Sequence, residues 1–507
     1  MKAFLMFRDR DFDPQQELPP SVQALIQDLE LDTLFNAMAR DDKLLSEVAK
    51  SAVLSGTRND LDTILYRQDI LRDCLSHPST VREIYDLAGE TIASERKIYF
   101  GIIRYPSSVL RRSIEALEMF VGMLKKLRRI ADDHADEFES AGFTRFFAML
   151  HEELNDDYFD VIKGHLRELK FRGGVLVSAE LGKGNKGANY TLRKQDKKYG
   201  WMERLLGAGP RAYTLHISDR DESGARALSE LRDRGINLVA NALAQSNDHI
   251  LSFFHMLRTE LAFYIGCLNL HEHLAQIGEP TTFPMPVGVR ERRHSFEGLY
   301  DVCLALTMEQ KIVGNDVDAD YKDLVIITGA NQGGKSTFLR SIGSSQLMMQ
   351  CGMFVPAKAF CSNLRDGLFT HFKREEDAAM SSGKLDEELS RMSEIVDHLT
   401  SNSMLLFNES FAATNEREGS EIAGQITRAL LEERIKVFFV THLYEFAHGF
   451  YGKQLDGALF LRAERQADGE RTFKMIEGEP LQTSYGGDLY SRIFETDDHP
   501  LFHREMV

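Results

Sequence analysis

Residues 324–337 read LVIITGANQGGKST. The first five suit a buried strand, and Gly329 to Ser336 fit the pattern G-x-x-x-x-G-K-[ST], which opens a helix. Glycines let backbone N–H groups cradle phosphates at the helix N-terminus. Lys335 would reach the β- and γ-phosphates, and the Ser336 hydroxyl would ligate Mg²⁺. The stretch therefore predicts a nucleotide site, and the combination of strand, Lys-Ser and helix disfavours a chance glycine-rich turn.

Further strands and helices are expected on the C-terminal side of this stretch. Apolar runs that suit buried strands alternate there with patterns that suit helices. The expected strands are 324–328, 404–407 and 437–440, and the expected helices are 335–350 and 416–433. Strands that alternate with helices favour a parallel sheet.

Two long amphipathic helices are expected in the N-terminal part of the chain. Their apolar stripes are Leu110, Ile114, Leu117, Val121 and Leu124, and Ile250, Phe254, Leu257, Leu261, Ile265 and Leu268. Between them, strand-like runs at 175–181, 190–192 and 213–217 accompany a loop rich in Gly, Lys and Asn. This favours a small β-rich module between helical arms. The helix-breaking residues 283–286 mark the boundary with the α/β part.

Charge is unevenly distributed along the chain. The net charge of −17 argues against a surface that is basic all over. From Lys163 to Arg211, however, twelve Lys and Arg accompany four Asp and Glu, so this segment carries +8 and the remainder −25. The five cysteines form no CxxC pair, and no run of about 18 apolar residues occurs. We therefore expect a cytoplasmic protein without a disulfide framework, a secretion signal or a membrane span.

Two other strand ends carry polar residues. The run 404–407 ends in Asn408 and Glu409, where a nucleotide-binding sheet places a ligand for a magnesium-bound water and a base that positions the attacking water. His442 follows the run 437–440 and would lie where open α/β sheets bind ligands, close enough to sense a γ-phosphate. Taken alone, a strand that ends in Asn-Glu is more often an ordinary exit from a strand into a loop. A histidine that follows a strand, such as His442, is more often structural. The glycine-rich stretch upstream favours the functional interpretation.

Several segments together resemble one known family. They are 327–337 (ITGANQGGKST), 352–357 (GMFVPA), 368–370 (LFT), 407–409 (FNE), 441–442 (TH) and 484–486 (SYG). Their sequence, order and approximate spacing are similar to those of the MutS family of DNA-repair ATPases, over about residues 285–490. A weaker similarity to the start of the family's core and lever lies at 67–71.

The resemblance implies a multidomain α and α/β fold. It divides the chain into an N-terminal helical region at 1–100, a helical lever and core at 101–282, and an ABC-like P-loop ATPase domain at 283–507. The basic, β-rich insertion lies at about 164–220 within the second part. The implied cofactors are ATP and Mg²⁺, and the implied assembly is a homodimer through the ATPase domains, with no membrane partner.

The resemblance also implies roles for individual residues. The nucleotide would be bound by Gly329, Asn331, Gly333, Gly334, Lys335, Ser336 and Thr337, the metal by Ser336 and Asn408, and the catalytic residues would be Glu409 and His442. Ser382 and Lys384 would contact the nucleotide of the second subunit. An exposed, charged helix start is the alternative for those two.

The chain departs from the family pattern at three places. Asn408 replaces the usual Asp, which puts full hydrolytic competence in question, and SSGKLDEE at 381–388 replaces a Ser-rich signature. The only Phe-x-Glu, at 407–409, already belongs to the ATPase strand, and little room precedes the lever for a mismatch-reading domain. No Smr-like nuclease tail is expected either. We therefore expect nucleic-acid binding by shape and charge, without preference for a mispaired base.

The favoured hypothesis is an ATP-dependent DNA clamp in repair or recombination that acts on duplex or branched DNA. Its phosphate contacts would be Lys183, Lys186, Arg193, Lys194, Lys197 and Lys198. A solvated loop is the alternative for this cluster.

The alternative function is an ABC-type ATPase switch on ribosomes, RNA or branched nucleic acid. An ABC transporter subunit is disfavoured because the Leu-Ser-Gly-Gly-Gln signature is missing.

Overall fold

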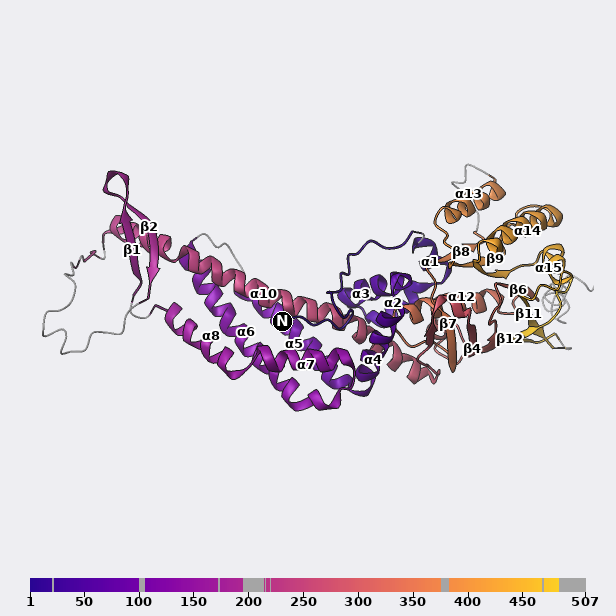
Figure 1. Cartoon of the computed structure of the whole chain (residues 1–507), viewed down its shortest axis with the longest axis horizontal. Helices are drawn as coiled ribbons and strands as arrows, with labels where there is room; N and C mark the ends of the chain where they lie inside the picture. Colours follow the sequence, from indigo (N-terminus) through magenta and orange to yellow (C-terminus); the bar gives the residue numbers. More distant parts are fainter. Residues whose placement is uncertain are drawn as a thin grey trace, which may run out of the picture. The chain divides into compact units, whose positions relative to one another are not determined.

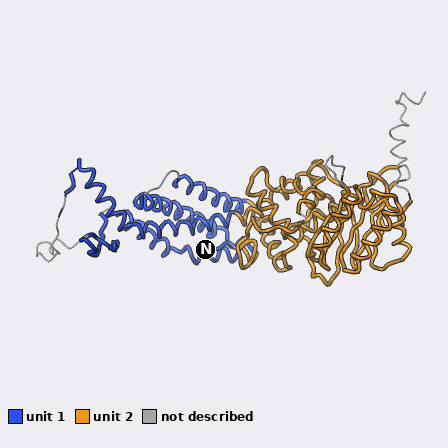
Figure 2. The backbone as a smooth tube through the Cα atoms, turned by 90° about the horizontal axis from the view of Figure 1, so that it is seen from above, with its two compact units in different colours: residues 1–3, 79–139, 143–258 blue, residues 4–78, 140–142, 259–507 orange. Residues whose placement is uncertain are grey.

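The computed structural model describes residues 1–20, 22–99, 105–171, 174–194, 214, 216–218, 220–374, 383–466 and 469–482. The chain forms two compact units (Figure 2). Unit 1 comprises Met1–Ala3, Ser79–Glu139 and Phe143–Arg258, and unit 2 comprises Phe4–Pro78, Ser140–Gly142 and Thr259–Val507. No helix in the described part of the chain is both long and apolar enough to cross a bilayer. The domain boundaries expected from the sequence stay predictions.

Unit 1 is built mainly from long helices (Figure 1). They are α5 (Pro78–Ile98), α6 (Pro106–His134), α7 (Ala141–Glu153), α8 (Asp156–Leu169) and the first part of α10 (Glu222–Ile277), with a short turn η2 (Ala135–Glu137). Both expected apolar stripes are buried, one on α6 and the other on α10. Phe120 stacks on Phe254 with ring centroids 6.5 Å apart, and the Asn247 amide donates to the Ser113 carbonyl at 2.8 Å. These contacts hold α6 against α10.

A two-stranded hairpin interrupts the helices of unit 1. Strands β1 (Leu176–Leu181) and β2 (Gly187–Arg193) pair antiparallel around the turn η3 (Lys183–Asn185), which confirms the first two expected strands. The third, at 213–217, is wrong for its described members, residues 214, 216 and 217, which form no strand. Short apolar runs do not distinguish a strand from a loop, because periodicity needs more residues.

Unit 2 contains two sheets and the helices around them. The helices are α1 (Val22–Asp28), α2 (Leu31–Ala39), α3 (Lys43–Leu54), α4 (Leu61–Ser76), the part of α10 from residue 259 onward, α11 (Val302–Met308), α12 (Lys335–Gln350), α13 (Lys384–Val396), α14 (Glu416–Glu432) and α15 (Tyr444–Tyr451), with short turns η1 (Gly56–Arg58) and η4 (Val289–Glu291). The strands of the larger sheet are β6 (Leu324–Gly329), β8 (Leu368–Phe372), β9 (Met404–Asn408), β10 (Lys436–Val440), β11 (Ala458–Arg465) and β12 (Arg471–Glu477). The smaller sheet consists of β3 (Met285–Val287), β4 (His294–Leu299), β5 (Asn315–Asp318) and β7 (Ala359–Asn363).

The larger sheet has the order β12-β11-β6-β10-β9-β8. Its strands are parallel except β12, which pairs antiparallel with β11. The expected parallel sheet and its expected strands and helices are therefore confirmed. The smaller sheet, with the order β3-β7-β4-β5, was not expected.

Helices cover both faces of the larger sheet. On one face, Ile326, Phe407 and Phe439 pack in a core with apolar residues of α13, α14 and α15. On the other face, α12 lies so close that a Cβ at Gly343 would be 2.8 Å from Leu406 Cδ1. Because β6, β10 and β9 are parallel neighbours, their carboxyl ends meet at one edge of this sheet.

Helices α1–α4 also belong to unit 2. Arg67 of α4 is buried and donates to the Cys351 carbonyl just after α12, at 3.2 Å. The Asn59 amide donates to the carbonyl of Gln350, the last residue of α12, at 2.9 Å. The N-terminal segment is thus fixed to the helix that follows the glycine-rich loop.

Candidate nucleotide-binding site

The glycine-rich loop, residues 329–336, runs from the end of β6 into the start of α12 and has at two positions a left-handed backbone that favours glycine. Gly329 has φ 106° and Gly334 has φ 83°. A Cβ at Gly333 would lie 2.6 Å from Ala463 Cβ, and one at Gly329 would lie 2.8 Å from the Ala463 nitrogen. Left-handed residues in a loop that opens a helix curve the backbone so that N–H groups can converge on one anion. This glycine-rich loop therefore has the shape of a phosphate site.

Lys335, the first residue of α12, places a positive charge inside this curve. Its side chain is 5% exposed, and Nζ donates to the carbonyls of Gly329 and Ala330 at 3.1 and 3.0 Å. Burial lowers the pKa of Lys335 to about 8, while the Glu409 carboxylate acts in the opposite direction. The side chain is thus still mostly an ammonium at neutral pH, and its pKa lies close to physiological pH.

The ends of β9 and β10 meet this loop. Ser336 Oγ donates to Asn408 Oδ1 at 3.0 Å, and His442 Nε2 lies 2.7 Å from Glu409 Oε1. The structure thus brings together all four of these predicted site residues. Oxygen donors on Ser336 and Asn408 suit a hard cation such as Mg²⁺. No group of three or more His, Cys, Asp or Glu within the described ranges could hold a metal ion by itself.

Glu409 is ionised at neutral pH. Its hydrogen bond with His442 lowers the pKa of Glu409, burial opposes that shift, and the charges of Lys335 and Lys373 add to the lowering. Because the carboxylate is an acceptor, His442 carries its proton on Nε2 and donates it. This hydrogen bond engages Oε1 of Glu409.

A pocket of about 590 Å³ lies beside the loop. Its polar side is formed by Glu409 and by loop and helix residues from Asn331 to Ser336. Its apolar side is formed mainly by Leu304, Met308, Ile312, Val313, Phe338 and Phe473. Such a cavity, with an anion-binding end and an apolar end, matches a nucleotide in both chemistry and size.

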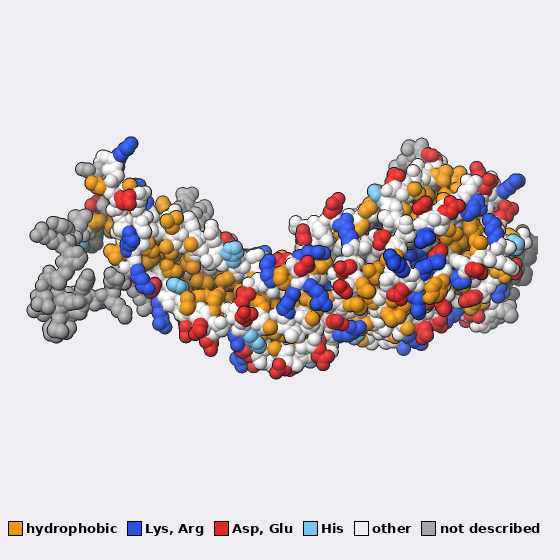
Figure 3. Space-filling view, in the orientation of Figure 1, with side chains coloured by type: hydrophobic (Ala, Val, Ile, Leu, Met, Phe, Trp, Pro, Cys, Tyr) orange, Lys and Arg blue, Asp and Glu red, His pale blue; other side chains and the backbone are white. Residues whose placement is uncertain are grey.

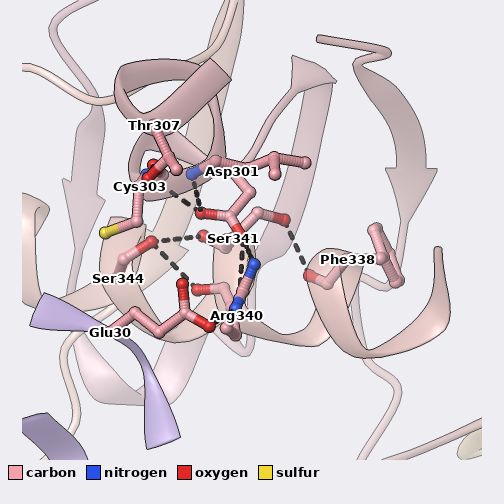
Figure 4. A network of polar contacts seen from close by, with 9 residues as sticks. Glu30, Asp301, Cys303, Thr307, Phe338, Arg340, Ser341 and Ser344 are labelled. Atoms are coloured by element: carbon pink, nitrogen blue, oxygen red, sulfur yellow. Dashed lines mark hydrogen bonds and ion pairs between the residues drawn. The ribbon is translucent and has the colours of Figure 1, made fainter. Parts of the chain in front are cut away.

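A polar network fixes the wall of this pocket (Figure 4). Asp301 caps α11 by accepting the backbone N–H groups of Cys303 and Leu304, at 3.0 and 3.2 Å. Arg340 of α12 donates from Nε to Asp301 Oδ2 at 2.8 Å and also pairs with Glu30. Since Asp301 and Leu304 line the pocket, this network holds α11 to the helix that begins at the glycine-rich loop.

Sequence reasoning missed this network and one further loop contact. Arg471 of β12 donates from Nε to the Asn331 carbonyl at 3.3 Å. Asp301 before an apolar run has the sequence signature of a helix N-cap, so its capping role could have been found. The partners of Arg340 and Arg471 lie far away in the chain and leave no local signal.

Thr337, in the first turn of α12, also lines the pocket. The remaining predicted nucleotide contacts lie elsewhere or outside the described ranges, and Lys384 is the first residue of α13. Ser382 lies outside the described residues, as do Lys197 and Lys198.

The four described cations of the predicted nucleic-acid patch lie at the hairpin of unit 1. Lys183 and Lys186 are exposed at its turn. Arg193 donates to Ser178 Oγ at 2.9 Å, and Lys194 pairs with Glu168 at 2.7 Å. In Figure 3 the hairpin presents Lys and Arg side chains with acidic side chains among them. The local charge is therefore smaller than a count of cations suggests.

Fold and site together define a protein that joins a helical unit to an α/β unit with a glycine-rich loop at the carboxyl edge of its sheet. Residues 59–277 match the family model described as MutS2 N-terminal domain, and residues 325–491 match the one described as MutS domain V. The chain belongs to the MutS family.

Several relatives are named "DNA mismatch repair protein MutS". One from Leptospira interrogans is 27% identical over 48% of this chain and 30% of its own length. One from Thermotoga maritima is 31% identical over 43% of this chain and 29% of its own, and one from Thermus aquaticus is 32% identical over 35% and 22%. The matched part of the chain thus spans less than a third of each of these relatives.

We predict that Asp301 and Arg340 are energetically coupled. Arg340→Leu leaves a buried carboxylate unpaired and should lower the free energy of unfolding by about 3 kcal/mol. Asp301→Asn keeps the helix cap but loses the ion pair. The double variant should lose at least about 1 kcal/mol less than the sum of the single losses. Urea unfolding followed by circular dichroism measures all three, and additive losses would show that the pair is not coupled.

Proposed function

We propose that the chain is a MutS-type ATPase that couples ATP binding and hydrolysis at the glycine-rich loop to DNA binding in repair. The observation that carries the proposal is the convergence of Lys335, the Ser336–Asn408 pair and the Glu409–His442 pair at one edge of the sheet. The match to MutS domain V over this region supports it. The DNA mismatch repair relatives support the link to DNA.

Each side chain has a role in this proposal. The Lys335 ammonium binds β- and γ-phosphate oxygens together with the N–H groups of the loop. Ser336 and Asn408 hold Mg²⁺, which supplies positive charge at the phosphates. The Glu409 carboxylate accepts a proton from the attacking water, and His442 keeps one Glu409 oxygen occupied so that the other faces the water.

The apolar side of the pocket supports a nucleoside. Leu304 and Met308 of α11 and the following Ile312 and Val313 line it. Burial of a base or ribose against such side chains contributes affinity through the hydrophobic effect. ATP, which has both a triphosphate and a base, fits the two ends of this site.

The proposal includes a homodimer in which bound ATP holds two ATPase domains together and the helical unit carries the change to DNA. The family membership supports this assembly. Lys183, Lys186, Arg193 and Lys194 are the described contacts that we assign to DNA phosphates. Lys197 and Lys198 remain predicted contacts, and Ser382 and Lys384 remain predicted contacts to the nucleotide of the second subunit.

Binding measurements test the DNA part of the proposal. The purified chain, with and without ATP, is titrated with homoduplex, mismatched, branched and single-stranded DNA and with RNA of equal length. We expect at least about tenfold tighter binding to one of the DNA forms than to RNA, a difference of about 1.4 kcal/mol. A preference for RNA would instead favour a switch on ribosomes or RNA.

We predict that Glu409→Gln binds ATP as the parent does but loses at least about a hundredfold in kcat, because general-base catalysis contributes about that much. Calorimetry gives the affinity, and phosphate release gives kcat. Glu421→Gln, an exposed carboxylate on α14, is the matched control and should hydrolyse like the parent. Equal hydrolysis by the Glu409 variant would remove Glu409 from the mechanism.

We predict that ATP affinity falls as pH rises past the pKa of Lys335. Only the ammonium binds phosphate well, and burial places that pKa at about 8. The dissociation constant should therefore increase about tenfold from pH 7 to pH 9. Lys335→Arg, whose charge persists over this range, should show a flat profile, and Lys335→Ala should not bind. A parent affinity constant across this range would contradict the assignment.

We predict that the hairpin turn contacts nucleic-acid phosphates. Lys183→Glu with Lys186→Glu should weaken every nucleic-acid ligand, and the slope of log K against log salt on duplex DNA should fall by about 1.8 if two phosphate contacts are lost. Lys126→Glu with Arg129→Glu on α6 makes the same charge change outside the hairpin. If both double variants bind DNA equally well, the hairpin is not the contact.

A further inference from the structure

Helix α13 is fastened to the turn that follows β9. Glu388, one turn into α13, is 3% exposed, and its Oε2 accepts the backbone N–H of Phe411 at 2.8 Å. The Glu388 backbone carbonyl lies 2.9 Å from His371 Nε2, and His371 Nδ1 lies 2.8 Å from Ser410 Oγ. Phe411 is therefore held by α13, and Ser410 is held by His371 at the end of β8.

The turn held in this way is strained. Glu409 has φ 55° and Phe411 has φ 62°, and each left-handed non-glycine residue costs about 1 kcal/mol or more. Such conformations persist only where the surroundings fix them. The Glu409 N–H donates to the Val440 carbonyl at 2.9 Å, and α14 approaches so closely that a Cβ at Gly419 would lie 2.4 Å from the Phe411 carbonyl oxygen.

The buried carboxylate of Glu388 is costly in itself. Burial raises the pKa of Glu388, while the hydrogen bond from Phe411 and the nearby charge of Arg391 lower it. An apolar side chain of similar volume would be buried at less cost, so packing alone does not account for the carboxylate. Beyond packing, Glu388 supplies an acceptor for the backbone N–H of Phe411, the last residue of the strained turn.

We propose that Glu388 is a positioning residue for ATP hydrolysis: by accepting the Phe411 N–H it holds the turn at 409–411 and keeps the Glu409 carboxylate against His442 and the pocket. This inference rests on the proposed ATPase function. Glu388 does not line the nucleotide pocket, so its effect reaches the reacting water only through Glu409. Small misplacements of a catalytic group lower the rate strongly and ground-state affinity little.

Two nearly isosteric variants test this. Glu388→Gln keeps an oxygen that can accept the Phe411 N–H, whereas Glu388→Met fills the same space without an acceptor. Glu388→Met leaves the Phe411 N–H without this acceptor, which costs stability, so circular dichroism is used to select for the kinetic comparison only variants that fold as the parent does. We expect Glu388→Met to lose about ten- to a hundredfold in kcat with KM and ATP affinity within about twofold of the parent, and Glu388→Gln to restore most of kcat.

Glu394→Met, an exposed position on the same helix, is the matched control and should keep the parent kcat. The inference is overturned if Glu388→Met keeps the parent kcat, if Glu388→Gln falls as far as Glu388→Met, or if KM and affinity change as much as kcat. A parent protein that binds but does not hydrolyse ATP, or does neither, would instead overturn the proposed function. The two failures are therefore distinguishable.

Discussion

The buried ammonium of Lys335 is the interaction on which the site depends. It lies inside the curve of the glycine-rich loop and donates to the carbonyls of Gly329 and Ala330. The loop can curve in this way because glycine at 329 and 333 leaves room for Ala463 of β11. A cation removed from water interacts strongly with an anion that reaches it. In the proposed ATPase, the same burial that lowers the pKa of Lys335 would therefore strengthen its interaction with a phosphate.

Parallel strand pairing brings the remaining side chains to this charge. β10 pairs with both β6 and β9, so the residues that follow these strands meet although they are far apart in the chain. Ser336 and its partner Asn408 are 72 positions apart, and Glu409 and its partner His442 are 33 apart. A shift in the β10–β9 pairing would separate both pairs, and a shift in the β10–β6 pairing would separate Ser336 from Asn408, because each pair is set by where its strands end.

The sequence predicted the parts of this fold whose signals are local. The expected helix at 335–350 coincides with α12, and the expected strand at 404–407 differs from β9 by one residue, because each is bounded by residues that begin or end such elements. The smaller sheet was not predicted, since its strands are short and pair across long stretches of chain. The Arg340–Glu30 contact joins residues 310 positions apart. The contact between Glu388 and Phe411 likewise depends on tertiary packing that no periodic pattern reveals.

Two carboxylates near the site have separate tasks in the proposed ATPase, and the residue next to one of them, Asn408, is neutral. An Asp at 408 beside Glu409 would place two negative charges at one strand end, and like charges raise a neighbouring carboxyl pKa. With an amide there, Glu409 stays ionised through its bond with His442. The other carboxylate, Glu388, accepts a backbone N–H and does not line the pocket. Of the two described acidic residues that line the pocket, Asp301 caps α11 and pairs with Arg340, so in the proposed ATPase the rate of hydrolysis would depend on the turn that holds the other, Glu409.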